Sequence, residues 1–331
     1  MARLTTFSRF LITLAIIGAI FFGVRKFLPN LGKTSNTEIT TNDEAKTNPD
    51  GGNTSNQIQP TQFERPAFNY TPPAPVNGKL KGVVEMGATG FNSFIIRIDA
   101  NKNWKLEKSQ FGASLIKEGL ATDQDIKNGL KSYIAEMLAF GVGGRDIHFV
   151  ISSGAKKEEI TNKIIKFLGE FGYVVNTVTP EQEGRYALKA CLPSSYAANS
   201  FVTDIGSSNT KISYTKGGRI QAYECQGAKY FQNQISDIDV ANDVAAKSSN
   251  IPTSNRETCF ILGGVPYELA KQVRNGKERY TVLKAPGDYK AEGDKQRCGL
   301  NIYNAIAKTT NCKQFIFDWD ANFTIGFLLE L

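Results

Sequence analysis

Two short stretches of the sequence place an acid, a glycine and small polar residues in the same order. The first runs from Glu85 to Gly90, and the second from Asp204 to Thr210. In each, the acid closes an apolar run, and a turn of small residues leads into another strand-like run. Such a turn exposes backbone N–H groups with no side chain in the way, and this concavity suits phosphate oxygens. The acid can hold a hydrated Mg²⁺ or orient a water.

The two stretches lie about 120 residues apart in the chain. Two such hairpins facing each other across a cleft would hold a polyphosphate from both sides. A later apolar run, Thr258 to Leu262, ends in Gly263 and Gly264 before a predicted helix. A helix start of this kind can take a further anion or leave room for a nucleoside.

Apolar periodicity predicts the elements that must position these turns. Strands are expected at 82–86, 93–98, 104–106, 147–152 and 173–178, with helices at 122–139, 157–170 and 181–190. A second cycle follows, with strands at 200–204, 211–214 and 258–262 and a helix at 266–273. Residues 315–329 are apolar and strand-like. Strands that alternate with helices predict an α/β fold.

The double hairpin with a later strand–Gly–Gly resembles the actin-like ATPase superfamily of sugar kinases, actins and heat-shock chaperones. The order of motifs is most similar to the exopolyphosphatase / guanosine pentaphosphate phosphatase family, from about Val83 to Ala270. The stretches that carry the likeness are 85–94, 111–155, 178–185, 204–210 and 226–229. The resemblance implies a two-lobed actin-like (ribonuclease H-like) fold, with lobes at 81–199 and 200–331.

The resemblance also implies roles for residues. Glu183 matches the family's catalytic glutamate and would deprotonate a water, while Asp204, with Glu85, would hold Mg²⁺. A surface position for Glu183 on its helix is the alternative. The expected phosphate-binding residues are Gly87, Ala88, Thr89, Gly90, Gly206, Ser207, Ser208, Asn209, Thr210, Lys211, Lys157, Gly263 and Gly264, with Lys156 as an alternative to Lys157.

The chain departs from the family beside these turns. Glu85 stands where the family has Asp, the second hairpin lacks the triple glycine, and Lys211 replaces an acid. The family's arginine after the connecting strand corresponds to Lys156 or Lys157, and another is replaced by Gln110. Lysine does not replace arginine in bidentate phosphate binding. These departures bear on activity more than on fold.

The sequence is consistent with two functions, one of an enzyme and one of a binding module. The first is a membrane-tethered, Mg-dependent hydrolase of phosphoanhydrides: polyphosphate, guanosine polyphosphate or ATP. The alternative is a weakly active or inactive nucleotide- or phosphate-binding sensor or scaffold, which passes lobe closure to a membrane partner. Lys211 and the replaced arginines favour the alternative, and Glu183 favours the enzyme. A filament-forming actin-like protein is a third and less favoured interpretation.

The N-terminal 32 residues are expected to anchor the chain in a membrane. Phe10 to Val24 is a run of fifteen uncharged apolar residues, near the length of a bilayer span once Phe27 and Leu28 are added. A cleaved signal peptide is the rival, but no small-x-small cleavage site follows. Basic residues flank the run almost equally, so orientation is nearly undetermined. We expect a single-pass protein with its soluble domain in the cytoplasm, where ATP and guanosine nucleotides are found.

Residues 33–80 are expected to be a disordered tether, because they are rich in Thr, Asn, Gly and Asp and poor in large apolar residues. The aromatic and proline-rich part, residues 63–75, is either a strap on the folded domain or more linker. The linker interpretation is favoured.

Composition narrows the function further. The formal charge of +7 favours anionic ligands, but the basic residues are dispersed, so no nucleic acid partner is expected. The one histidine, His148, lies in an apolar run and is expected to be structural, which argues against a triad hydrolase. The five cysteines are expected to be buried free thiols. A second copy of the chain or a membrane protein are the candidate protein partners, and no role is assigned to Asp318 or Asp320.

Overall fold

The computed structural model describes residues 68–331 except 88–89, 113–121 and 157–158. All of them lie in one compact unit. The predicted anchor and residues 33–67 of the predicted tether lie outside the described residues. Among the residues that are described, no helix is long and apolar enough to cross a membrane.

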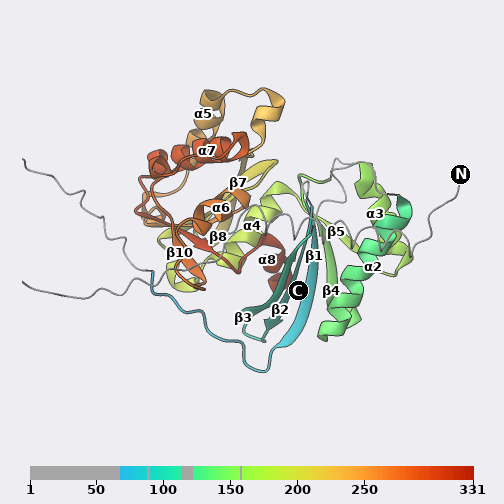
Figure 1. Cartoon of the computed structure of the whole chain (residues 1–331). Helices are drawn as coiled ribbons and strands as arrows, with labels where there is room; N and C mark the ends of the chain where they lie inside the picture. Colours follow the sequence, from blue (N-terminus) through green and yellow to red (C-terminus); the bar gives the residue numbers. More distant parts are fainter. Residues whose placement is uncertain (1–67, 88–89, 113–121, 157–158) are drawn as a thin grey trace, which may run out of the picture. The chain divides into compact units, whose positions relative to one another are not determined.

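The first sheet has five strands in the order β3-β2-β1-β4-β5. They are β1 (Lys79–Gly87), β2 (Gly90–Ile98), β3 (Trp104–Phe111), β4 (Ile147–Ile151) and β5 (Val175–Thr177). The first three form an antiparallel meander, and β4 and β5 add in parallel to β1. Helices α2 (Asp123–Phe140) and α3 (Glu159–Glu170) lie beside β4 and β5 (Figure 1).

The second sheet has six strands in the order β10-β11-β9-β6-β7-β8. They are β6 (Ser200–Ile205), β7 (Asn209–Lys216), β8 (Arg219–Gln226), β9 (Thr258–Leu262), β10 (Tyr280–Val282) and β11 (Gln314–Asp318). Helices α5 (Asp237–Ser248), α6 (Gly264–Lys271) and α7 (Asp294–Thr310) pack on one another and on this sheet. The predicted repeat of hairpin followed by parallel strand is thus present in both sheets.

Two helices join the sheets. Helix α4 (Pro180–Cys191) follows the first sheet in the chain but packs on β6, β7 and β8 of the second. Helix α8 (Phe323–Glu330) ends the chain, packs against α4, and also contacts β1 and β2. Their shared core includes Val83 and Phe94 from the first sheet and Val202 and Phe260 from the second. Because the core is continuous across both sheets, the hairpins at its edge are held in fixed positions.

The predicted strands and helices up to α4 are confirmed, with shifted ends. Thr122 caps α2 as expected, with a reciprocal bond from Asp125. The apolar spacing of α2 predicted Ile134 and Leu138 on its inward face, but Leu138 is 48% exposed and Met137 is buried. In α3 it predicted both Ile164 and Ile165 inside, but only Ile164 is buried.

The strand-like interpretation of residues 315–329 was wrong over its second half. Strand β11 ends at Asp318, and the chain then forms α8, which Asn322 caps through its side chain. Helix α8 is apolar on nearly all sides because it is buried between the sheets, and short apolar runs do not distinguish a buried helix from a strand. Helices α5 and α7 and strands β8 and β10 were not predicted.

The linker preference was also wrong for residues 68–78, which form a strap. The ring of Phe68 lies 5.2 Å from that of Tyr280 and 5.7 Å from that of Phe260, measured between centroids. Tyr70 contacts Tyr196 and Tyr280. The backbone N–H of Val76 donates to Asp99 Oδ2 at 3.0 Å. Strand β1 then begins at Lys79, earlier than predicted.

The histidine and cysteine expectations hold. His148 lies in β4 with its ring 6.0 Å from that of Phe327, and burial lowers its pKa. All five cysteines are free thiols; Cys312 is half-buried and the other four are buried.

Candidate functional site

The first hairpin holds Glu85 at the end of β1, directly opposite Asn92 of β2. Glu85 is only 9% exposed. Its Oε2 accepts from the side-chain amides of Asn92 at 3.0 Å and Asn322 at 3.1 Å. Asn322 also caps α8, so the C-terminal helix is fastened to this hairpin. The other oxygen, Oε1, lies 3.4 Å from where a Cβ on Gly87 would stand, so it faces the turn.

The second hairpin turns between Ile205 and Asn209, with Asp204 opposite Lys211. The N–H of Gly206 donates to Asn209 O at 3.0 Å and closes the turn. The segment after β8 lies over it: the backbone N–H groups of residues 227, 228 and 229 donate to the carbonyls of residues 208, 206 and 207. A Cβ on Gly227 would lie 2.3 Å from Asn209 N, so only glycine allows this approach. The turn's carbonyls are thereby satisfied on one side.

Gly263 joins the second hairpin. It follows β9, whose Leu262 pairs with Asp204 in the parallel ladder. It has a φ of 106°, and a Cβ there would lie 2.2 Å from the carbonyl oxygen of Ile205. Gly263 therefore lies directly against the Asp204 turn. Gly264 is exposed at the start of α6.

Glu183 lies on α4 and is fully buried, at 0% exposed, so the surface alternative was wrong. Thr179 caps the helix and Pro180 occupies its first turn. The next residue, Gly184, lets α4 approach β8, since a Cβ there would lie 3.0 Å from that of Ala222. Glu183 accepts the backbone N–H of Ser153 on Oε1 and forms an ion pair with the Lys211 ammonium on Oε2.

Asn209 connects three segments that are distant in sequence. Its side-chain amide donates to Ser153 Oγ at 2.9 Å and to Glu224 Oε1 at 2.7 Å. Ser153 follows β4, Asn209 opens β7 and Glu224 lies on β8. Ser153 thus contacts both Glu183 and the second hairpin. The stretch 111–155 carried part of the family resemblance, but no role was predicted for Ser153. Glu224 and Asn322 were not predicted as site residues.

The carboxylates and Lys211 form one buried electrostatic cluster. Burial raises the pKa of Glu85 to about 7, against the two amide hydrogen bonds and with a smaller contribution from Asp204 and Glu183. Burial also raises the pKa of Asp204, although Lys211 opposes this. For Lys211, burial alone would lower the pKa, but the nearby carboxylates outweigh it and the pKa is raised. The lysine is therefore a protonated cation surrounded by acids.

The donors present do not fit the Mg²⁺ that the resemblance implies. The ammonium of Lys211 is paired to Glu183, and it lies 3.8 Å from where a Cβ on Gly206 would stand. Glu85 and Asp204, the two expected ligands, flank this cation rather than an open oxygen-lined position. Across the described part of the chain, no group of three acids, cysteines or histidines is arranged to hold a metal ion. The Mg²⁺ assignment therefore stays a prediction.

The remaining predicted residues fall into three groups. Ala88, Thr89 and Lys157 lie outside the described residues. Ser207 and Ser208 are accessible in the turn, and Lys156 is exposed after β4. Thr210 is 0% exposed in β7, and its hydroxyl has no hydrogen-bond partner. Its side chain is therefore part of the core in this conformation, which corrects its predicted phosphate contact.

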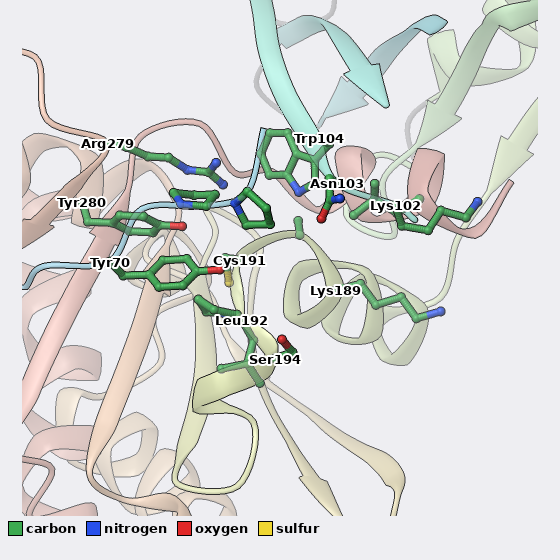
Figure 2. Close-up of a pocket in the computed structure, with 15 residues that line it drawn as sticks. Tyr70, Lys102, Asn103, Trp104, Lys189, Cys191, Leu192, Ser194, Arg279 and Tyr280 are labelled. Atoms are coloured by element: carbon green, nitrogen blue, oxygen red, sulfur yellow. The ribbon is translucent and has the colours of Figure 1, made fainter. Parts of the chain in front are cut away.

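A cavity of about 360 Å³ lies elsewhere, under the strap, and none of the predicted phosphate or metal residues lines it. Figure 2 shows Tyr70, Trp104, Arg279 and Tyr280 around it. Arg279 donates to both carboxylate oxygens of Asp318 at 3.0 Å, and its guanidinium lies 4.4 Å from the Trp104 ring. Asp320 completes this group at 3.7 Å. Asp318 and Asp320 thus hold an arginine between the sheets, a structural role that the sequence had not revealed.

Comparison with known proteins supports the fold. No protein-family model and no curated protein matches the sequence. Among solved structures, an exopolyphosphatase from Cytophaga hutchinsonii matches with a TM-score of 0.59 at 13% identity, over 76% of this chain and 98% of the other. A PPX-GPPA enzyme from Aquifex aeolicus matches with a TM-score of 0.58 at 17% identity, over 76% and 99%. The type II variant of an Aquifex aeolicus Ppx/GppA phosphatase gives 0.56 at 16% identity, over 76% and 99%.

These likenesses cover nearly the whole of each solved structure at low sequence identity. They confirm the resemblance first drawn from the two hairpins and the strand–Gly–Gly. The chain has the two-sheet α/β fold seen in the Ppx/GppA phosphatase structures.

Proposed function

We propose that this chain binds a phosphoanhydride between the β1–β2 and β6–β7 hairpins and that the form described here holds the ligand without rapid hydrolysis. Polyphosphate, guanosine polyphosphate and ATP are the candidate ligands. The fold and the accessible turn residues Ser207 and Ser208 support binding at this place. Backbone N–H groups in a turn of small residues are suited to phosphate oxygens.

The observation that carries the absence of rapid turnover is the state of Glu183. One carboxylate oxygen accepts the Ser153 N–H, the other is paired to Lys211, and the residue is 0% exposed. A general base must be within hydrogen-bond reach of the water that it deprotonates. Because Glu183 is fully buried and its Oε2 faces the Lys211 ammonium, solvent water does not reach this carboxylate in the arrangement described. The site as described therefore fits a sensor or scaffold better than a hydrolase.

Hydrolysis is the second candidate, and one observation favours it. Through Ser153, Glu183 is connected to Asn209 at the second hairpin, which places it beside the proposed phosphate position. A bound phosphate that drew the Lys211 ammonium away would free Glu183 Oε2 to orient a water. Phosphoryl transfer depends mainly on such positioning and on charge neutralisation. The solved relatives that carry this fold are described as phosphatases or exopolyphosphatases.

A tethered sensor is consistent with the N-terminal region. We propose that residues 1–32 anchor the chain in a membrane, with the folded domain in the cytoplasm. The strap, described from Phe68 onward, packs beside Phe260 and Tyr280 of the second sheet. A movement of one sheet against the other would shift the position of the strap. We propose that a second copy of the chain or a membrane protein responds to this shift.

The test combines thermal shift with phosphate release on the full-length chain. ATP, polyphosphate and guanosine tetraphosphate are each offered with and without Mg²⁺. Binding at about 100 times Kd stabilises a protein by about 2.7 kcal/mol, which corresponds to a rise in Tm of several degrees at this size. We expect stabilisation by at least one ligand and phosphate release no faster than in Glu183→Gln.

The controls separate the two functions. Glu181→Gln lies on the same helix but is exposed, so it should leave ligand binding and phosphate release unchanged. Release that disappears in Glu183→Gln and persists in Glu181→Gln would establish the hydrolase instead. If no ligand stabilises the chain and none is cleaved, the proposed binding function is wrong.

A further inference from the structure

The second hairpin carries its own cation. Lys211 lies opposite Asp204 in the β6–β7 ladder, and neighbours opposite each other in an antiparallel pair project their side chains from the same face. Its ammonium is paired with Glu183 and lies beside the turn at Gly206. The side chain is only 7% exposed, so this charge cannot be a solvated surface charge.

Three acids from three different elements act on this ammonium. Glu183 reaches it from α4, Asp204 from the neighbouring strand β6, and Glu85 from the first hairpin. Three acids around one cation would leave an unbalanced buried negative charge if the lysine were removed. Buried charges without partners are costly, so such acids must take up protons or bind another cation.

We propose that the Lys211 ammonium occupies the place of a metal ion in this chain, so that the hairpin site neutralises a bound phosphoanhydride without Mg²⁺. The part of this inference that concerns the phosphoanhydride rests on the proposed binding function. The part that concerns Lys211 and the metal does not. The neighbouring acids are the groups that would bind a divalent metal ion. The Lys211 ammonium already neutralises part of their charge. A divalent ion placed among the same acids would lie next to the Lys211 ammonium and be repelled by it. Lys211 and a metal would therefore compete for this position.

The number of acids points the same way. Glu85, Glu183 and Asp204 are three acids whose charges act on one buried ammonium. A Lys211 side chain that served only packing would not need three acids within its electrostatic reach.

The first experiment uses Mg²⁺ alone on the full-length chain, so it does not depend on the phosphoanhydride. Magnesium chloride is compared with choline chloride at equal ionic strength by thermal unfolding. The wild type should show the same Tm in both salts. Lys211→Gln should gain about 3–6 °C from Mg²⁺ over choline, as expected for a cation at about ten times its Kd. Lys216→Gln, an exposed position on the same strand, should behave as the wild type.

The second experiment measures binding of inorganic triphosphate by calorimetry, in EDTA and in Mg²⁺. Wild-type affinity should agree within about twofold between the two conditions, after correction for Mg–triphosphate formation. Lys211→Gln should bind about tenfold or more weakly in EDTA and recover in Mg²⁺. Lys211→Arg retains the positive charge and should remain indifferent to Mg²⁺, which keeps the test decisive should Lys211→Gln fail to fold.

The outcomes distinguish this inference from the proposed function. If triphosphate binds no variant but Mg²⁺ stabilises only Lys211→Gln, the binding function fails and the exchange of metal for lysine stands. A wild type that Mg²⁺ stabilises beyond choline would overturn the exchange. So would a folded Lys211→Gln that Mg²⁺ leaves unchanged, or a Lys211→Arg that gains from it.

Discussion

The Lys211 ammonium and the Glu183 carboxylate form an ion pair in which the acid is completely buried. The residues belong to different elements, β7 and α4, and α4 packs on β7 and β8, with Gly184 at its close approach to Ala222 of β8. A pair at such depth is costly to desolvate, and removing one partner leaves the other charge uncompensated. The pair therefore bears on both the chemistry and the stability of the site.

Breaking this pair should destabilise the fold. Glu183→Gln keeps an acceptor for the Ser153 N–H but leaves Lys211 without its direct partner. We expect a loss of about 3 kcal/mol in the free energy of unfolding, the range for a broken buried pair. Urea denaturation checks this. Glu181→Gln on the exposed face should change the value by less than about 0.5 kcal/mol. Equal effects from both variants would show that the pair contributes nothing.

Glu85 should make stability fall as pH rises. Its pKa is raised to about 7 by burial, above that of the unfolded chain, so the folded state holds the proton more tightly. The resulting stabilisation is complete below about pH 4.5 and disappears as pH rises through about 7. Glu85→Gln mimics the protonated form at all pH values. Its unfolding free energy should match the wild type near pH 4.5 and exceed it by about 3 kcal/mol at pH 8.

Urea denaturation of wild type and Glu85→Gln at the two pH values measures this difference directly. The comparison removes contributions from other titrating groups that both proteins share. A difference that does not change with pH would contradict the assignment of the raised pKa.

The second hairpin should tolerate no side chain at position 227. A Cβ there would lie 2.3 Å from Asn209 N, so Gly227→Ala must displace the covering segment or the turn. We expect ligand stabilisation in the thermal-shift assay to be lost, with a folding cost of about 1–3 kcal/mol from overpacking. Gly169→Ala is the matched control, because nothing lies within 4 Å of its Cβ position and it sits in α3. That variant should gain up to about 1 kcal/mol.

The strap should contribute measurably to stability. Phe68 packs against the rings of Tyr196, Phe260 and Tyr280, and it is half-buried. Phe68→Ala should cost about 2 kcal/mol, below the 3–5 kcal/mol of a fully buried phenylalanine. It should also expose the segment to limited proteolysis. Val76→Ala, at a position 71% exposed, should have little effect on either measurement. Proteolysis at equal rates in both variants would show that residues 68–78 are not held.

Asn209 should contribute more to the free energy of unfolding than a side chain that makes one hydrogen bond. Its amide bonds Ser153 and Glu224 at once, and it is 8% exposed. Asn209→Ala leaves the Ser153 hydroxyl without this donor and should cost about 1–3 kcal/mol. Asn176→Ala on β5, which makes one bond at 3.3 Å, should cost less. Chemical denaturation of the two variants orders them, and the reverse order would contradict the bridging role.

The sequence by itself determined the fold class and the two turns. Apolar runs that alternate with amphipathic helices, and an acid before glycine in each turn, depend only on neighbouring residues. The hairpin registers Glu85–Asn92 and Asp204–Lys211 were not predicted and came from the folded chain. The C-terminal helix was predicted as a strand because every residue from Phe323 to Leu328 is buried between the sheets. A helix that is apolar on all sides shows no periodic alternation of polar and apolar residues.

Only the tertiary structure decided the state of Glu183. Its burial depends on α4 packing on the second sheet, and its partner Lys211 stands 28 positions later in the chain. Asn322 donates to Glu85, which lies 237 positions earlier in the chain. Arg279 pairs with Asp318 and gives that acid a structural role. Such contacts arise because the core is continuous through both sheets and fixes which side chains meet. A lysine that replaces an acid is visible in the sequence, but that it sits as a cation among three acids is a property of the folded chain.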